Sequence, residues 1–372
     1  MNNVKNLKTL IVKKPLILDC GKTINNYPIA YETYGTLNDR KDNAILIFHA
    51  LTGDQFASGI NPITNKKGWW SFLIGPKKGI DTNKYFVICA NVLGGCMGSY
   101  GPSSVDTKND KRLDTNFPII TINDMVNAQY NLLDFFKIDK LFSVVGGSMG
   151  GMQVLQFISN FPGKAKTAIP IACTASHSAQ NIAFNELGRQ AIMADANWKD
   201  GNYSKLNLSP NKGLSVARMA AHITYLSKNG LQEKFGRKLQ ERDSLKFGFD
   251  ADFQIESYLR YQGSIFVDRF DANSYLYITR AMDYFDLTSQ FKGNLSKAFE
   301  KSKTKFFIIS FTSDWLYPTS ENKEIVIALN ACGADVRFTE ITSDKGHDSF
   351  LLDVPDFLDT IKKFLNISYL KK

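Results

Sequence analysis

The clearest chemical signal in the sequence is a serine placed in a glycine-rich turn. Residues 146–150 read Gly-Gly-Ser-Met-Gly, which matches the pattern G-x-S-x-G, and a further glycine follows. The apolar run Leu141–Val145 precedes the pattern, and a helical run, Met152–Asn160, follows it. A serine between a strand and a helix, flanked by small residues, is typical of a strained turn that exposes its hydroxyl for nucleophilic attack. A glycine-rich packing turn would explain the same short pattern, so Ser148 needs catalytic partners elsewhere.

Two residues near the C-terminal end supply such partners in the order serine, acid, histidine. Asp314 follows the apolar run Lys305–Ser310, and His347 follows the run Val336–Ile341. The chain has four histidines, and His347 is the only one that comes after this acid. A histidine here can take the proton of the serine hydroxyl while an aspartate orients its ring. The sequence therefore predicts a catalytic triad of Ser148, Asp314 and His347.

Backbone N–H groups near the serine would stabilise the negative oxygen that forms during such an attack. In this architecture one N–H belongs to the residue after the nucleophile, here Met149, and another to a loop after an early strand. The segment after the apolar run Ala44–Phe48 reads His-Ala-Leu-Thr-Gly, and its position gives this oxyanion role to Leu51 or Thr52. The loop Asn91–Ser104 has four glycines but matches no phosphate-binding pattern, so we expect it to border the site.

The elements that must position these residues read as a parallel sheet covered by helices on both faces. Short runs that are apolar throughout alternate with helical patterns, as in buried parallel strands. The strand-like runs are Ala44–Phe48, Tyr85–Ala90, Leu141–Val145, Ala168–Ala172, Lys305–Ser310 and Val336–Ile341, with a helical run at Asn123–Phe136.

Between about residues 175 and 295 strand-like runs disappear and the pattern becomes helical. The helical runs are Ala179–Asp195, Gly213–Ser227, Ile255–Arg269 and Ser274–Ser289. We therefore expect an α/β core of residues 1–174 and 300–372, interrupted by an inserted helical lid, residues 175–299. His177 and His222, within this insertion, are expected to be structural.

Composition excludes several classes of protein. The chain has 372 residues, 44% of them apolar and 22% charged, which is not the composition of a disordered protein. No stretch approaches the ~18 apolar residues of a membrane span, and no secretory signal is visible, so we expect a cytoplasmic protein. The five cysteines are scattered without a C-x-x-C pair, which argues against a disulfide framework or a zinc knuckle; Cys96 is expected to be structural.

The net charge of +9 suits an anionic partner, but no nucleic-acid-binding module is recognisable. Much of the excess lies in residues 200–246, where nine Lys or Arg stand against four Asp or Glu. This part of the lid could therefore attract an anionic substrate, although a solvated helical surface would have the same composition.

Long stretches of the chain resemble the homoserine O-acyltransferases of methionine biosynthesis. The resemblance extends from about residue 10 to 365 and is carried by His49–Asp54, Gly68–Trp70, Asn91–Ser104, Gly146–Gln153, Ala217–Ser227 and Gly346–Asp348. It implies an α/β-hydrolase fold with a helical lid, and an acyl group that passes from coenzyme A through the serine to homoserine. It implies no metal and no bound cofactor, with acyl-CoA as a co-substrate.

The resemblance also assigns residues to homoserine, which carries one positive and one negative charge. It implies that Arg218 binds the carboxylate, that Asp348 binds the ammonium, and that Tyr225 adds a hydrogen bond. Two helical turns separate Arg218 from Tyr225, which places them on one face. Without the resemblance, a solvated lid arginine and a helix-capping aspartate would be the simpler explanations of Arg218 and Asp348.

The acyl donor is expected to be acetyl-CoA. Succinyl-type relatives place an arginine two residues after the catalytic aspartate, whereas this chain has Leu316 there. Leucine cannot neutralise a succinyl carboxylate. One departure from the acetyl-type pattern is Ser99-Tyr100, which stands where two threonines are common and could alter the mouth of the pocket.

Three alternatives remain: a homoserine O-succinyltransferase, a serine O-acyltransferase, and an esterase that uses water as the acceptor. The resemblance further implies a homodimer formed through the lids, with no nucleic-acid or membrane partner.

Overall fold

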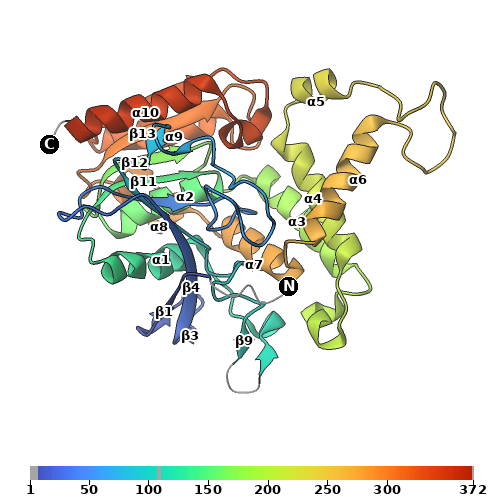
Figure 1. Ribbon diagram of the computed structural model, residues 1–372, viewed down its shortest axis with the longest axis horizontal. Helices are drawn as coiled ribbons and strands as arrows, with labels where there is room; N and C mark the ends of the chain where they lie inside the picture. Colours follow the sequence, from blue (N-terminus) through green and yellow to red (C-terminus); the bar gives the residue numbers. More distant parts are fainter. Residues whose placement is uncertain (1–6, 107–109, 371–372) are drawn as a thin grey trace.

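The computed structural model in Figure 1 is organised around one eight-stranded sheet. The structure describes residues 7–106 and 110–370. The strands lie side by side in the order β1 (Thr9–Val12), β4 (Tyr27–Tyr34), β8 (Phe86–Ala90), β5 (Ala44–Phe48), β11 (Leu141–Gly147), β12 (Ala165–Ile171), β13 (Lys305–Phe311) and β14 (Val336–Ile341). Each neighbouring pair from β8 to β14 is parallel, while β4 pairs antiparallel with both β1 and β8.

The parallel part of the sheet is built from strands that are apolar throughout. Every residue of β5 and β8 is buried, because helices or loops cover both faces. This confirms the expected parallel α/β sheet. The antiparallel edge formed by β1 and β4 was not predicted, because β4 mixes tyrosines, a proline and a glutamate and has no continuous apolar run.

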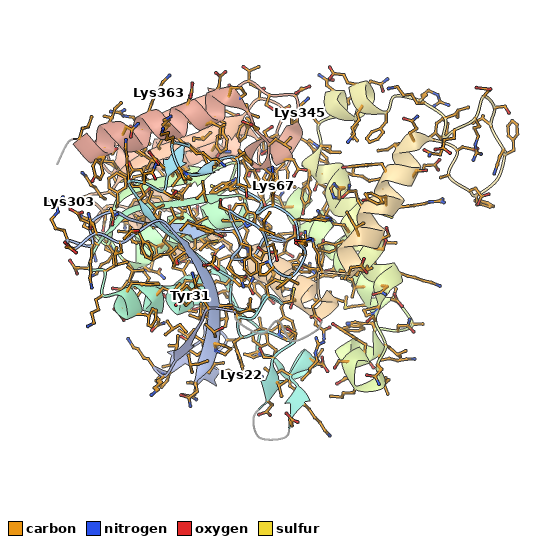
Figure 2. The ribbon with its side chains drawn as sticks, viewed as in Figure 1. Lys22, Tyr31, Lys67, Lys303, Lys345 and Lys363 are labelled. Carbon is orange, nitrogen blue, oxygen red and sulfur yellow. The ribbon has the colours of Figure 1, made fainter. Side chains whose placement is uncertain are left out.

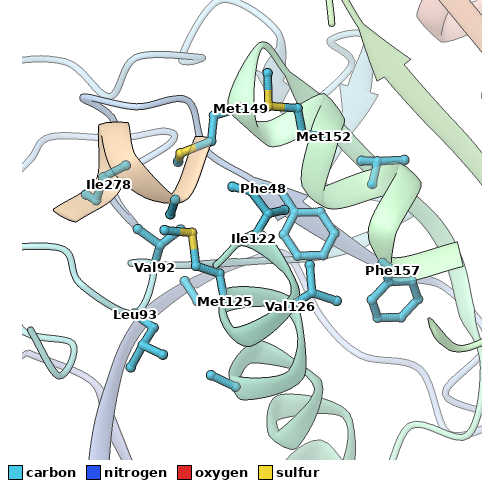
Figure 3. Close-up of a cluster of buried hydrophobic side chains, with 14 of the residues drawn as sticks. Phe48, Val92, Leu93, Ile122, Met125, Val126, Met149, Met152, Phe157 and Ile278 are labelled. Atoms are coloured by element: carbon cyan, nitrogen blue, oxygen red, sulfur yellow. The ribbon is translucent and has the colours of Figure 1, made fainter. Parts of the chain in front are cut away.

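Alternate residues of β5 belong to two separate cores. Leu46 and Phe48 pack with α1 (Ile122–Phe136) and α2 (Met149–Asn160), and Figure 3 shows Phe48 among side chains of these helices. Ile45 and Ile47 pack on the opposite face. There they meet Trp70 and α10 (Pro355–Leu370). The first core also contains residues of α9 (Thr319–Ala331).

The segment between β12 and β13 is helical, as the sequence predicts. It contains α3 (Ala179–Met193), α4 (Asn211–Tyr225), α5 (Lys228–Lys234), α6 (Gln254–Val267), α7 (Ala272–Asp283) and α8 (Leu287–Gln290), and no β-strand. Figure 1 shows α4, α5 and α6 together at one side of the sheet. Residues of α3, α4, α6, α7 and α8 all contribute to the first core. The division of the chain at residues 175 and 299 stays a prediction, and residues 1–6, 107–109 and 371–372 of the expected core lie outside the described chain.

The remaining elements are short. Three two-stranded pairs join β2 (Leu16–Ile17) to β3 (Thr23–Ile24), β6 (Ile74–Gly75) to β7 (Ile80–Asp81), and β9 (Val105–Asp106) to β10 (Lys111–Arg112). The described residues also form five 3-10 helices, at Asp114–Asn116, Lys199–Gly201, Tyr203–Leu206, Leu295–Ala298 and Gly346–Leu351. Within residues 7–106 and 110–370, no helix is both long enough and apolar enough to cross a bilayer.

The sheet places the predicted chemistry along one edge. In a parallel sheet the carboxyl ends of all strands meet at the same side, and ligand sites form there. His49 follows β5, Ser148 follows β11, Asp314 lies just past β13, and His347 lies just past β14. The order of the strands therefore brings together residues that are far apart in the sequence.

Candidate active site

Ser148 occupies a strained turn between β11 and α2. Its backbone has φ 59° and ψ −127°, a conformation that a residue with a side chain rarely adopts and that costs about 1–3 kcal/mol. The turn is fixed by a hydrogen bond from its N–H to the Ile171 carbonyl, at 2.9 Å. A side chain at Gly150 would place its Cβ 2.1 Å from the Phe48 carbonyl oxygen, so this position requires glycine. The helix begins at Met149, three residues earlier than predicted, directly after the serine.

The three predicted triad residues are joined by hydrogen bonds. His347 Nε2 lies 2.9 Å from Ser148 Oγ, and His347 Nδ1 lies 2.7 Å from Asp314 Oδ2. The other carboxylate oxygen of Asp314 accepts the backbone N–H groups of Leu316 and Tyr317, both at 3.0 Å. These bonds hold the carboxylate where it accepts the Nδ1 proton, so Nε2 keeps its lone pair for the serine proton. All three side chains are buried, with at most 6% of each residue exposed.

The two N–H groups expected to bind the oxyanion lie beside the serine. Met149 is the first residue of α2, where the first N–H groups of a helix have no partner within it. Leu51 follows β5 and lines the same cavity as Ser148. Neither N–H donates a hydrogen bond to another residue in the described parts of the chain. Both are therefore free to bind a developing negative charge, whereas Thr52, the other possibility, does not line this cavity.

Arg218 lies on α4 with its guanidinium between aromatic rings. The group is 4.7 Å from the centre of the Phe266 ring and 5.7 Å from that of Tyr225, and one nitrogen lies 3.4 Å from Thr52 Oγ. It forms no ion pair with an acidic side chain in the described residues. Because no carboxylate contacts the guanidinium directly, its N–H donors are available to an anionic ligand. Tyr225 lines the cavity of Ser148, and its ring centre is 6.0 Å from that of His347.

Asp348 follows the catalytic histidine on the 3-10 helix Gly346–Leu351. Burial raises the pKa of its carboxyl group to about 6, against the opposing effects of His347 and Arg218. The lid contacts the loop that precedes this 3-10 helix, because the Ser227 hydroxyl donates a hydrogen bond to the Asp344 carbonyl. Figure 2 shows Lys345, the next residue, on the side of the core that faces the lid.

The cavity beside Ser148 is small and carries no cationic side chain of lysine or arginine. Its volume is about 30 Å³, and its walls come from the oxyanion loop, α3, α4, α7 and the acid loop. The lining residues are Leu51, Ser148, His177, Asn181, Phe184, Asn185, Ala221, Thr224, Tyr225, Tyr275, Met282, Leu316 and Tyr317. Tyr100 is not among them; its ring packs on Phe117 at 5.4 Å.

Two groups near the site were missed by the sequence analysis. His177, expected to be structural, lines the cavity; its Nε2 lies 2.8 Å from the Tyr317 hydroxyl and its Nδ1 lies 3.2 Å from Asp283. Arg269 donates to the Thr52 carbonyl at 2.9 Å, and burial lowers the pKa of its guanidinium. Both come from the lid and lack a local motif, so only their tertiary contacts reveal them.

Two other expected structural residues are buried and inert. Burial lowers the pKa of His222 to about 3, which keeps its ring neutral. Burial raises the pKa of the Cys96 thiol to about 12, so the nucleophilic thiolate is scarcely populated near neutral pH. Within residues 7–106 and 110–370, no group of three or more His, Cys, Asp or Glu side chains is placed to hold a metal ion.

Comparisons with known proteins place this arrangement in a family. A family model described as the alpha/beta hydrolase fold matches residues 43–354. A homoserine O-acetyltransferase from Pelagibacter ubique (strain HTCC1062) is 78% identical over 371 residues, a coverage of 100% of each chain. The crystal structure of homoserine O-acetyltransferase from Bacillus anthracis superposes with a TM-score of 0.87 at 28% identity, covering 97% of each chain. The structure of esterase E22 is similar, with a TM-score of 0.86 at 29% identity over 97% of this chain and 99% of that one.

Proposed function

Because the chain belongs to the homoserine O-acetyltransferase family, and is thus an acyltransferase with the α/β-hydrolase fold, we propose that it moves an acetyl group from acetyl-CoA to the hydroxyl of L-homoserine. The observation that carries this proposal is the hydrogen-bonded triad beside a cavity with an unpaired arginine nearby. The reaction takes place in two half-reactions, each of which uses the triad once.

In the first half-reaction Ser148 becomes acetylated. Its Oγ attacks the thioester carbon while His347 Nε2 takes the hydroxyl proton, and Asp314 stabilises the imidazolium that forms. The N–H groups of Leu51 and Met149 bind the carbonyl oxygen as it becomes negative. The carbon–sulfur bond then breaks, and the sulfur of coenzyme A leaves with the proton from His347.

In the second half-reaction homoserine replaces coenzyme A. Arg218 binds its carboxylate, because a guanidinium presents two N–H donors in the geometry of a carboxylate. Asp348 binds the ammonium group, and Tyr225 supplies a further hydrogen bond. His347 removes the proton of the homoserine hydroxyl, which attacks the acetyl-serine, and Ser148 recovers a proton as the ester leaves.

The cavity favours an acetyl over a succinyl donor. A succinyl group carries a free carboxylate that an acetyl group lacks, and the wall of this cavity presents Leu316 but no lysine or arginine. Burying a carboxylate without a cation costs several kcal/mol. His177 also lines the wall, but both of its ring nitrogens already have partners: Nδ1 lies 3.2 Å from Asp283 and Nε2 lies 2.8 Å from the Tyr317 hydroxyl.

An esterase is the second candidate, and a specific observation supports it. Esterase E22 has nearly the same fold, so the fold does not decide between water and an amino acid as the acceptor. The unpaired Arg218 favours the amino acid, since water needs no cation to bind it. Serine is a third possible acceptor, because one methylene gives only ~1–3 kcal/mol of discrimination.

A thiol-release assay separates these possibilities. The protein is mixed with acetyl-CoA or succinyl-CoA, together with homoserine, serine or no acceptor, and free coenzyme A is measured. The proposal predicts rapid turnover only with acetyl-CoA and homoserine together. Turnover of similar rate without an acceptor would establish an esterase, and preference for succinyl-CoA or serine would establish one of the other transferases.

We further propose that the reaction belongs to methionine biosynthesis in the cytoplasm, with acetyl-CoA as a co-substrate and no resident cofactor. We also propose a homodimer that pairs through the lids, without nucleic-acid or membrane partners. Light scattering of the purified protein tests the dimer.

A further inference from the structure

The loop that carries Leu51 is held by a buried histidine that the two half-reactions do not use. His49 follows β5 directly, and only 1% of its surface is exposed. Burial lowers the pKa of its imidazole to about 4, so the ring is neutral near pH 7. A neutral ring has one N–H donor and one lone pair, and its surroundings decide which nitrogen has which.

The contacts of His49 fix the position of its proton. The backbone N–H of Val92 donates to Nε2 at 3.0 Å, and the side-chain amide nitrogen of Asn91 lies 3.3 Å from the same atom. Nε2 must therefore present its lone pair, and the proton lies on Nδ1. Nδ1 is 2.7 Å from the carbonyl oxygen of Ala50, to which it donates a hydrogen bond.

The Ala50 carbonyl, which accepts the hydrogen bond from His49, and the Leu51 N–H belong to the same peptide group. The Ala50 carbonyl also accepts the N–H of Gly53, at 2.9 Å, so two donors meet on one oxygen. In a trans peptide the C=O and N–H groups point in opposite directions. The Leu51 N–H therefore points away from both donors, and Leu51 shares its cavity with Ser148.

We propose that His49 is a positioning residue for acylation: it fixes the plane of the Ala50–Leu51 peptide and polarises it, which makes the Leu51 N–H a stronger donor to the oxyanion. Hydrogen bonds in a chain strengthen one another, most of all away from water. His49 itself touches no reacting atom. The inference rests on the proposed role of Leu51 but not on the identity of the acyl donor.

The surroundings hold this loop against the helix that starts at the nucleophile. The Gln153 side chain of α2 donates to the His49 carbonyl at 3.2 Å. Figure 3 shows the side chains of Phe48, Val92 and Met149 in one buried cluster, and Phe48 directly precedes His49 in the chain. The Gln153 contact therefore ties the loop after β5 to the helix that begins directly after Ser148.

Two substitutions separate the two contacts of the ring. In H49N the amide nitrogen is attached to Cγ, as Nδ1 is, so it can still donate to the Ala50 carbonyl, whereas the Val92 N–H loses its acceptor. In H49Q the amide reaches the place of Nε2, so its oxygen can accept the Val92 N–H, whereas the donor to Ala50 is lost. Both variants lose the ring, but only H49Q loses the hydrogen bond to the Ala50 carbonyl that we propose positions and polarises the Leu51 N–H.

The assay is the burst of p-nitrophenol from p-nitrophenyl acetate, which reports acylation of the serine whatever the natural donor is. We expect H49Q to acylate about 10-fold more slowly with an unchanged KM, less than the ~10²–10³-fold loss of a whole oxyanion donor. We expect H49N to stay within about 3-fold of the wild type although its Tm is the lower of the two. Equal losses, unchanged rates in both, or a larger loss in H49N would overturn the inference.

The wild-type protein provides an independent test should H49Q fail to fold. The ¹⁵N chemical shifts of the histidine rings distinguish the two neutral tautomers, and four histidines make a simple spectrum. A proton on Nδ1 of His49 is expected, and a proton on Nε2 would overturn the inference. Failure of acetyl-CoA to acylate a protein that reacts with the ester would instead refute the proposed function alone.

Discussion

Replacing Arg218 by alanine should damage the second half-reaction and spare the first. The guanidinium forms no ion pair with an acidic side chain in the described chain, and its contact with Thr52 Oγ is long, at 3.4 Å. Its removal breaks no direct ion pair, but it takes away a positive charge that lowers the pKa of the buried Asp348 carboxyl group. That group can become neutral instead of remaining as an uncompensated charge, so a large loss of stability is not expected. The charge of Arg218 is instead available to the carboxylate of homoserine.

The size of the effect follows from the contact that would be lost. Hydrogen bonds to charged groups contribute ~1.5–3 kcal/mol, and a bidentate pair adds to this, so we expect a loss of ~2–4 kcal/mol in transition-state stabilisation. That corresponds to a fall of roughly 30- to 1000-fold in kcat/KM for homoserine. Arg218→Lys should recover only part of the loss, because an ammonium keeps the charge but not the planar fork.

The assay measures the two half-reactions separately. A burst of coenzyme A equal to the enzyme concentration reports the first, and kcat/KM for homoserine reports the second. Arg260→Ala is the matched control, because Arg260 is an exposed arginine on α6 that donates to the Phe249 carbonyl, away from the cavity. An equal loss in both half-reactions would show that Arg218 holds the lid in place, and an unchanged kcat/KM would refute its role in binding homoserine.

Three further predictions concern the acceptor, the donor and the lid. Because burial raises the pKa of Asp348 to about 6, its carboxyl group becomes neutral as the pH falls through 6, and KM for homoserine should rise there. Asp348→Asn should give a high KM that does not depend on pH in this range. A steep pH dependence of KM in the variant would contradict the role of Asp348. Leu316→Arg should raise the ratio of succinyl-CoA to acetyl-CoA turnover at least ~10-fold, because the new arginine can pair with the succinyl carboxylate and a 10-fold change corresponds to about 1.4 kcal/mol. An unchanged ratio would show that the cavity wall does not select the donor. Higher ionic strength should lower kcat/KM for acyl-CoA but not for homoserine, because salt screens the attraction between the basic lid and the anionic coenzyme A. Neutralising Lys234, Arg237 and Lys238 together should make kcat/KM for acyl-CoA less dependent on salt. Equal responses of both substrates to salt would exclude electrostatic attraction of acyl-CoA by the lid.

Local patterns were sufficient for the parts of the site that depend on local geometry. A strand, a G-x-S-x-G turn and a helix are contiguous, so the conformation of Ser148 follows from its neighbours. Asp314 and His347 follow strands of one parallel sheet, and the carboxyl ends of such strands meet at one edge. For that reason the fold class was predicted correctly, and the three triad residues lie within hydrogen-bonding distance.

Contacts that depend on packing between distant segments were not predictable in this way. Arg269 reaches the Thr52 carbonyl from the end of α6, and His177 meets Tyr317 across the boundary between lid and core. Neither residue has a neighbour in sequence that signals its partner. The tautomer of His49 likewise depends on an N–H of Val92, which belongs to the loop after another strand.

The central claim is that Ser148 carries the acetyl group between two substrates, and intact-protein mass spectrometry tests it most directly. Wild-type protein mixed with acetyl-CoA alone should gain the mass of one acetyl group, located on Ser148 by peptide mapping. Added homoserine should remove that mass and yield the O-acetyl ester, while Ser148→Ala should acquire no label. A label on Cys96, or full turnover by Ser148→Ala, would contradict the account.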